Sequence, residues 1–339
     1  MAPLTLIGLL AVVAGAPPVA QPVPGAHLRV ELLTIGPGPA AYSRFGHSAL
    51  RVTDRRGRGD IVFDFGTFDE DQPRVIGRFL QGRLQYFLSV DRYEETLNDV
   101  REQGRLLLAQ ELRLTGPQRL RLFRRLRRLT RPEHKHYRYH HFTQNCATRI
   151  RDELDRELGG QIRTQLRRIP AGTRRHWIRR ATRGAPGFHL MFDLILTHAD
   201  APASLWEASF APEALRDGLA RVRIRRGMAS VPLVIRTRVL HRGEGFGAAV
   251  SDSRWGFVLV LFGLLGLLLL PLVMAATRTW SWRLAGGALL VWGALQLVCA
   301  VVFIGLQLYA TLEQFRGNLH LAILSPMGIF FAWAGVGIL

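Results

Sequence analysis

Long uncharged hydrophobic runs fill the last quarter of the chain, whereas the first three quarters alternate between short hydrophobic and polar stretches. Residues 256–276, 284–310 and 319–339 are each about as long as a helix that crosses the hydrocarbon core of a bilayer. Trp255 and Trp280 lie at the ends of these runs, where amphipathic rings prefer the headgroup region. The pattern predicts a globular domain over 27–250 and about three transmembrane helices over 255–339.

The two ends of the chain indicate on which side of the membrane this domain lies. Residues 4–14 form a short apolar stretch followed by small residues, which predicts an export signal or an N-terminal anchor over 1–20. The loop after the first hydrophobic run carries Arg278 and Arg283, and an excess of positive charge marks a cytoplasmic loop. We therefore expect the globular domain on the outer side of the cytoplasmic membrane.

Within that domain, alternating and turn residues predict an antiparallel sheet together with helices. Residues 47–53 and 61–65 read as a β-hairpin with the polar tip "DRRGRGD". The alternation puts His47 and Ala49 on one face of the first strand, and it allows Asp64 to share that face. Helical spacing is found in a segment that begins near Cys146. The predicted class is α+β, with further strands at 27–35, 84–90 and about 105–114, and a further helix at 117–131.

The charge of the chain changes the list of expected partners. Its formal net charge is +19, carried almost entirely by arginine. Such a charge attracts polyanions, of which nucleic acid and an anionic lipid surface are the common cases. Arginines cover the predicted helix 117–131 and recur at 174–183. Beside a membrane anchor we expect an anionic membrane surface as the partner and no nucleic acid, although a solvated helix face would look the same.

Cys146 is the first candidate for chemistry. The other cysteine, Cys299, falls within the second hydrophobic run and cannot pair with it. A cysteine in the first turn of a helix meets unpaired N–H groups and the positive end of the helix dipole, which stabilise a thiolate. A thiolate nucleophile needs a base and a third group that orients the base, and His47 and Asp64 are the candidates. The alternative is a buried, inert cysteine.

Four histidines close to Cys146 offer a competing hypothesis. Clusters of this kind can bind zinc or copper, and they include His134, His136, His140 and His141. Their spacing matches no strong template, and adjacent residues of a regular element point in different directions. We therefore expect no metal, and we expect these histidines to line the entry to the cysteine helix.

Three segments resemble the exported domain of the Lnb-type lipoprotein N-acyltransferases. They are "LLTIGPGPAAYSRFGHSALRV", "DIVFDFGTFDE" and "YRYHHFTQNCATRIRDEL", and "FRGNLHLAILSPM" is similar to a stretch of that family's membrane part. The resemblance implies a circularly permuted papain-like thiol domain, akin to lecithin-retinol acyltransferase, in which the histidine strand precedes the cysteine helix. It also implies a bacterial inner membrane with the catalytic domain on the periplasmic side.

The resemblance further implies acyl transfer without a metal or a diffusible cofactor. Cys146 would take an acyl chain from a phospholipid, with His47 as general base and Asp64 as its orienting group. The N-terminal amine of a diacylated lipoprotein would then accept the chain. Asn145 and the backbone N–H of Cys146 would stabilise the oxyanion. Two alternatives stay open, namely a papain-like cell-wall peptidase or amidase and a non-catalytic basic membrane-bound binding module.

Overall fold

A computed structural model describes residues 23–243, with gaps at 39, 41–42, 70–72, 75–76, 79–80, 82, 183–188, 190–191, 193–195 and 197–198, and scattered positions between 286 and 301. No helix among these residues is both long and apolar enough to cross a membrane. The predicted signal or anchor at 1–20 lies outside the described residues. So do the predicted spans, apart from the scattered positions within 284–310.

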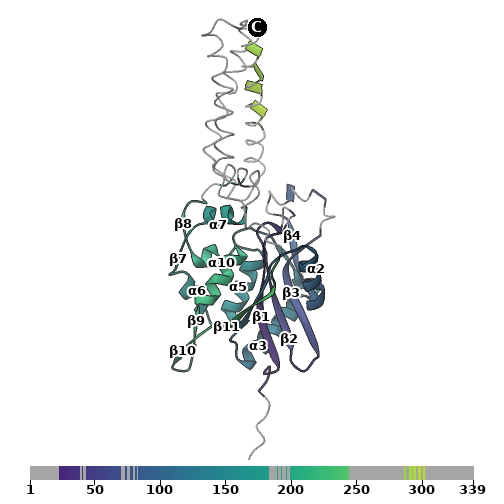
Figure 1. The fold of residues 1–339 in the computed structure, drawn as a ribbon, viewed down its shortest axis with the longest axis vertical. Coiled ribbons are helices and arrows are strands. Elements are labelled where there is room, and N and C mark those ends of the chain that lie inside the picture. Colours follow the sequence, from purple (N-terminus) through teal and green to yellow (C-terminus); the bar gives the residue numbers. More distant parts are fainter. Residues whose placement is uncertain are drawn as a thin grey trace, which may run out of the picture.

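An antiparallel sheet of seven strands forms the centre of the domain (Figure 1). Its spatial order is β11-β5-β1-β2-β3-β4-β6. The strands span Leu28–Ile35 (β1), His47–Asp54 (β2), Gly59–Phe68 (β3), Gln85–Arg92 (β4), Leu107–Leu112 (β5), His136–Arg138 (β6) and Val234–His241 (β11). The five predicted strands correspond to β1 to β5, and the predicted α+β class is confirmed. β6 and β11 were not predicted.

The β2–β3 hairpin confirms the predicted turn and fixes the register of the sheet. Leu50 pairs with Phe63 and Arg51 with Val62, so residues 49 and 64 are opposite each other. The tip turns at Gly57, whose φ of +75° is a conformation that suits glycine. Since successive side chains alternate between faces, His47 and Asp64 lie on the same face, as the sequence pattern predicts.

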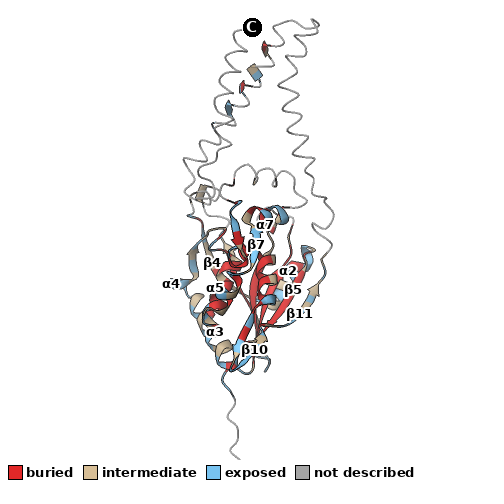
Figure 2. Cartoon of the chain, turned by 90° about the vertical axis from the view of Figure 1, so that its left-hand side faces the viewer, coloured by how far each residue is buried: buried red, intermediate tan, exposed pale blue. Residues whose placement is uncertain are grey.

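Helices cover both faces of the sheet (Figures 1 and 2). On one face, α3 (Gly116–Leu129), α5 (Cys146–Glu157) and α10 (Pro212–Arg221) pack on β1, β2 and β3. Their shared core contains fully buried side chains such as Leu32, Phe63, Leu126 and Ile150. On the other face, α2 (Tyr93–Glu102) covers a smaller cluster around Leu33 and Val62. The alternation along each strand therefore supplies two separate cores.

Shorter elements complete the side of the domain that carries α5. They are α4 (Pro132–Lys135), α6 (Gln161–Leu166), α7 (Arg174–Ala181), α9 (Leu205–Ala208), the strand pair β7 (Pro170–Thr173) and β8 (Pro202–Ser204), and the pair β9 (Arg223–Arg226) and β10 (Ala229–Pro232). The loop between α9 and α10 brings Phe210, which is 2 % exposed, to the start of α5. A segment far from Cys146 in the sequence thus shapes its surroundings.

Candidate active site

Helix α5 begins at Cys146 because the residues around it form a capping box. The Asn145 side chain accepts a hydrogen bond from the Thr148 backbone N–H at 2.9 Å, and the Thr148 hydroxyl accepts one from the Asn145 N–H at 2.8 Å. These bonds satisfy backbone donors that a helix start leaves unpaired. The partly buried thiol of Cys146 therefore sits in the first turn, at the positive end of the helix dipole.

The amide group of Asn145 ties two neighbouring loops to this helix start. Its Nδ2 donates to the carbonyl oxygens of His141 and Phe210, each at 2.8 Å. The residue is only 5 % exposed. Both of its N–H groups are thus engaged, so the contacts of Asn145 are those of a cap and a loop anchor.

His47 lies at the start of β2, directly against the backbone of β3. Its Nε2 is 2.7 Å from Oδ1 of Asp64, and the Gly66 N–H donates to the same oxygen at 2.5 Å. A Cβ atom on Gly66 would be 2.1 Å from Cε1 of the His47 ring. The imidazole can take this position only because residue 66 has no side chain.

The thiol of Cys146 lies in the wall of the same cavity as this imidazole. Since Nε2 of His47 faces Asp64, Nδ1 is the ring nitrogen left for a contact with the sulfur. Burial by itself would lower the pKa of His47, but the charges of Asp64 and Cys146 outweigh it and raise that pKa well above its ordinary value. The raised pKa favours the imidazolium form of His47.

Asp64 is held in its charged form by the same set of contacts. Burial would raise its pKa, but the attraction and hydrogen bond of His47, the Gly66 N–H and the charge of Arg105 lower it. A buried carboxylate of this kind can fix the orientation of an imidazole and favour its protonated form. The structure therefore brings His47, Asp64 and Cys146 together, although they are spread over a hundred positions of the sequence.

These groups open into a cavity of about 230 Å³. Residues from six parts of the chain line it, including the loop before β2 and the loop between α9 and α10. They are Ser43, Phe45, Gly46, His47, Asp64, Gly66, Phe68, Tyr86, Arg105, Tyr139, His141, Asn145, Cys146, Phe210 and Pro212. Seven of these fifteen residues carry aromatic rings, and Tyr86 stacks on Tyr139 with ring centroids 4.3 Å apart. An apolar group can therefore lie next to the thiol.

Sequence reasoning did not assign roles to several of these cavity residues. His141 was predicted to line the entry to the helix, and it lies in the cavity wall. His134 and His136 are exposed instead. Tyr139 belongs to the same "YRYHHFTQNC" segment as the predicted site, and this position in the sequence indicates it as a cavity residue. Phe210 comes from a distant loop, and no sequence pattern connects it with the site. Among the described residues, no three histidine, cysteine or acidic side chains converge as metal ligands would.

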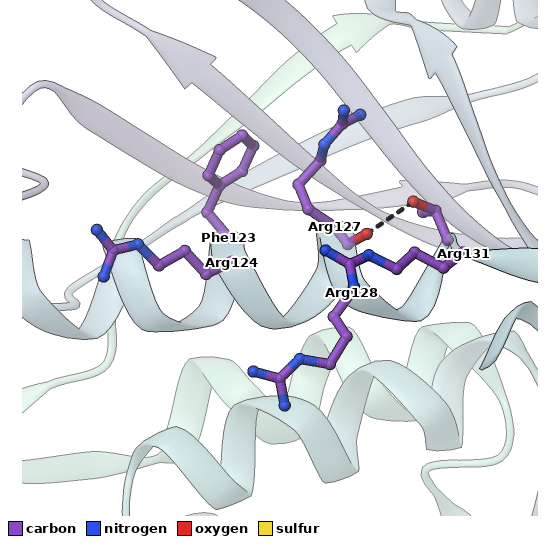
Figure 3. A pocket seen from close by; sticks show the side chains of 6 residues that line it. Phe123, Arg124, Arg127, Arg128 and Arg131 are labelled. Atoms are coloured by element: carbon purple, nitrogen blue, oxygen red, sulfur yellow. Dashed lines mark hydrogen bonds between the residues drawn. The ribbon is translucent and has the colours of Figure 1, made fainter. Parts of the chain in front are cut away.

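A second, larger cavity of about 530 Å³ lies at the end of α3 (Figure 3). Four exposed arginines spread around it, namely Arg124, Arg127, Arg128 and Arg131. None of the four forms an ion pair with any residue that the structure describes. Their neighbours Arg121 and Arg125 differ, since they pair with Glu157 and Glu153 of α5. One face of α3 thus forms ion pairs with α5, and the other face carries arginines without an ion-pair partner among the described residues.

Comparison with known proteins gives one match. Neither the curated proteins nor the solved structures include a chain that matches this one. Residues 19–180 match the family described as the Lnb N-terminal periplasmic domain, and this segment contains His47, Asp64 and Cys146. The description agrees with the predicted extracytoplasmic side for this domain. Over residues 19–180, the chain is therefore similar to the Lnb N-terminal periplasmic domain family.

Proposed function

We propose that this protein is a membrane-anchored thiol acyltransferase that moves an acyl chain from a phospholipid to the N-terminal amine of a diacylated lipoprotein. The observation that carries the proposal is the His47 imidazole, hydrogen-bonded to Asp64, in one cavity with the thiol of Cys146 at a helix start. That constellation is suited to covalent catalysis at a carbonyl carbon. The match to the Lnb N-terminal periplasmic domain family supports the link to lipoproteins.

The reaction has two halves. The Cys146 thiolate attacks the ester carbonyl of the donor, and the tetrahedral intermediate collapses when the His47 imidazolium gives its proton to the leaving alkoxide. The products are an acyl-thioester on Cys146 and a lysophospholipid. Neutral His47 then takes a proton from the lipoprotein amine as the amine attacks the thioester. An amide forms, and the thiol is regenerated by return of that proton.

The chain order supports a permuted papain-like domain as the scaffold. The histidine strand β2 precedes the cysteine helix α5, and α5 packs against β2 and β3. In this arrangement the helix start delivers the nucleophile to the end of the sheet where His47 and Asp64 lie.

The proposed substrates require access to a membrane surface. The three predicted hydrophobic spans would hold the domain there, and the arginines of α3 supply charge that suits anionic headgroups. Each basic residue near an anionic surface contributes about 1 kcal/mol. Both substrates of the reaction carry lipid chains, so anchoring would keep them near Cys146.

Replacement of the nucleophile tests the function. Purified full-length chain is incubated with phospholipid vesicles and a diacylated lipopeptide, and intact mass is measured for both protein and peptide. Wild type is expected to carry an acyl adduct on Cys146 and to add one acyl chain to the peptide, whereas Cys146→Ala does neither. His134→Ala, at an exposed histidine outside the cavity, is the matched control and is expected to behave as wild type.

The alternatives give different results in the same experiment. A papain-like peptidase or amidase would leave the lipopeptide unacylated but would cleave cell-wall peptides in a Cys146-dependent way. A non-catalytic module would do neither. Absence of an acyl adduct from wild type, with wall peptides cleaved, would contradict the acyltransferase proposal.

A further inference from the structure

His141 is a second histidine in the wall of the cavity that contains Cys146. Its Nδ1 is 3.1 Å from the Tyr139 hydroxyl oxygen. Its Nε2 is buried and has no hydrogen-bond partner among the described residues. A buried nitrogen without a partner is costly, so such a group on a residue that lines the cavity of Cys146 calls for a functional explanation.

The contacts of the ring favour one tautomer. A phenol is the better donor and an imidazole nitrogen the better acceptor, so Tyr139 donates its O–H to Nδ1 of His141. The proton of the neutral ring then lies on Nε2. The unpartnered atom is therefore an N–H donor.

His141 is also kept neutral and held rigidly. Burial, together with the nearby His140, lowers the pKa of His141 to about 4. The ring packs edge-on against Phe45 and is tilted against Phe210, with centroid distances of 4.7 and 5.4 Å. Asn145, the residue before the nucleophile, binds the His141 carbonyl oxygen at 2.8 Å. The loop that carries the ring is thereby fixed to the start of α5.

We propose that His141 is an oxyanion-binding residue, whose Nε2–H donates to the oxygen of the acyl group while Cys146 attacks it. This inference rests on the proposed function. The second donor is the backbone N–H of Cys146, which lies in the first helical turn. The side chain of Asn145 is less suited to this task because both of its N–H groups already donate to carbonyl oxygens.

A neutral imidazole has a physical advantage in this position. Charge develops on the carbonyl oxygen only as the sulfur attacks, so a fixed donor binds the transition state better than the ground state. A second imidazolium next to His47 would compete with it for the Asp64 carboxylate and the thiolate. Burial of His141 prevents that competition and leaves a donor without a full charge.

Two soluble reagents separate this role from a merely structural one. Acylation by p-nitrophenyl butyrate passes through an oxyanion, and its rate is read from the burst of nitrophenolate. Alkylation by iodoacetamide displaces iodide and forms no oxyanion, so it reports only on the thiolate and His47. Both rates are measured on the full-length chain in detergent for wild type, His141→Phe, His141→Gln and Tyr139→Phe. His134→Gln, at an exposed histidine outside the cavity lining, is the matched control.

The expected result is a selective loss. His141→Phe should slow the nitrophenolate burst by about 10²–10³-fold and leave the alkylation rate unchanged. His141→Gln should recover part of the burst rate because its amide is a donor, and Tyr139→Phe should give a smaller loss because the tautomer is no longer fixed. His134→Gln should match wild type in both reactions.

Other outcomes overturn the inference. If His141→Phe reacts as fast as wild type with the ester, or if it slows ester and iodoacetamide equally, His141 does not bind the oxyanion. Failure of the proposed function looks different, because wild type would then show no burst beyond that of Cys146→Ala, whatever residue stands at 141.

Discussion

Gly66 sets how closely the backbone of β3 approaches the ring of His47. The absence of a side chain there lets the imidazole lie between Asp64 and Cys146. This requirement differs from that of turn glycines with positive φ, because it concerns space and not backbone conformation. A residue that no chemical argument would select therefore controls the position of His47, the proposed general base.

Gly66→Ala should displace His47 while it leaves the fold intact. The new Cβ would lie 2.1 Å from Cε1 of His47, so the ring must move. Misplacement of a reacting group by about 1 Å can cost about 10²-fold in rate, and we expect that loss in both acylation and alkylation of Cys146. Gly59→Ala, on the same strand with nothing within 4 Å, is the control. Equal rates for both variants would contradict this placement of His47.

Asp64→Asn should shift the pH dependence of the site to lower pH. Without the carboxylate, burial dominates and the raised pKa of His47 falls. The imidazolium would then lose its proton at lower pH, and the alkaline limb of the acylation rate should move down with it. We expect the rate at neutral pH to fall by roughly 10²–10⁴-fold. Asp99→Asn, at an exposed position on α2, should leave the pH profile unchanged.

The same pair of groups also affects stability. The raised pKa of His47 stabilises the folded chain below its ordinary pKa of 6.5, and that contribution is lost as the pH rises through the folded-state value. The lowered pKa of Asp64 acts in the opposite direction, since its contribution is lost as the pH falls. Thermal unfolding of Asp64→Asn should therefore depend less on pH than that of wild type, from below the pKa of Asp64 to above the pKa of His47.

The capping box of α5 links the stability of the helix to the architecture of the site. Thr115 caps α3 in the same way, but its side chain makes only the local cap contact. Asn145 adds two hydrogen bonds to the carbonyls of neighbouring loops, a partly buried one to His141 and a buried one to Phe210. The two caps thus form a natural comparison within one chain.

Asn145→Ala should destabilise the fold more than Thr115→Ala does. Loss of a cap alone costs about 1 kcal/mol, which we expect for Thr115→Ala. Each buried carbonyl that loses its partner adds about 1–3 kcal/mol. The loss of unfolding free energy in Asn145→Ala should therefore exceed that in Thr115→Ala by at least this amount. Denaturation of the full-length chain, followed by near-UV circular dichroism, measures both. Equal losses of unfolding free energy in the two variants would show that the loop contacts of Asn145 are not formed.

The exposed arginines of α3 should govern attraction to anionic vesicles. Replacement of Arg124, Arg127, Arg128 and Arg131 by glutamine should weaken binding by roughly 10²–10³-fold at low salt, at about 1 kcal/mol per residue. The control removes the same charge from exposed arginines on other elements, namely Arg58, Arg101, Arg221 and Arg225. Vesicle flotation measures binding. Equal loss in both quadruple variants would mean that net charge matters and the α3 surface does not.

Elements with a clear alternation were predictable from sequence, and those at the margins of the sheet were not. β1 to β5 and α3 carry regular apolar positions, and the shared face of His47 and Asp64 follows from the period of two. β11 was missed because it is a largely exposed, arginine-bearing edge strand, and such a segment resembles a loop. The meeting of His47 with Cys146 needs the packing of α5 on β2, which no local pattern contains.

The fold of the whole domain extends beyond the segment that matches the family. The match covers 19–180, but β11 lies at one edge of the sheet, and the core includes Trp206, Leu215, Leu219 and Leu233. Phe210, which faces the start of α5, also lies beyond the match. The proposed catalytic groups are therefore within the matched segment, while part of their support is outside it.

A chain that contains only residues 23–180 should consequently fail to fold. It would expose the core face of α5, and β5 would lose β11 as its neighbour. A chain of residues 23–243 contains every described strand of the sheet and should fold cooperatively. Limited proteolysis and thermal unfolding distinguish the two, and a protease-resistant 23–180 fragment would contradict the expectation.

The last described turn of the domain also limits where the reaction can take place. Gly243 fits tightly against the backbone of Arg105 and Leu106, and His241 Nδ1 is 2.8 Å from the Arg105 carbonyl oxygen. Arg105 lines the cavity. Under the proposed function, only residues 244–255 separate this turn from the predicted span at 256–276, and a stretch of that length can reach about 40 Å at most. The enzyme would then work within a fixed radius of its own anchor, and proximity to the bilayer would select its substrates before any recognition at the thiol.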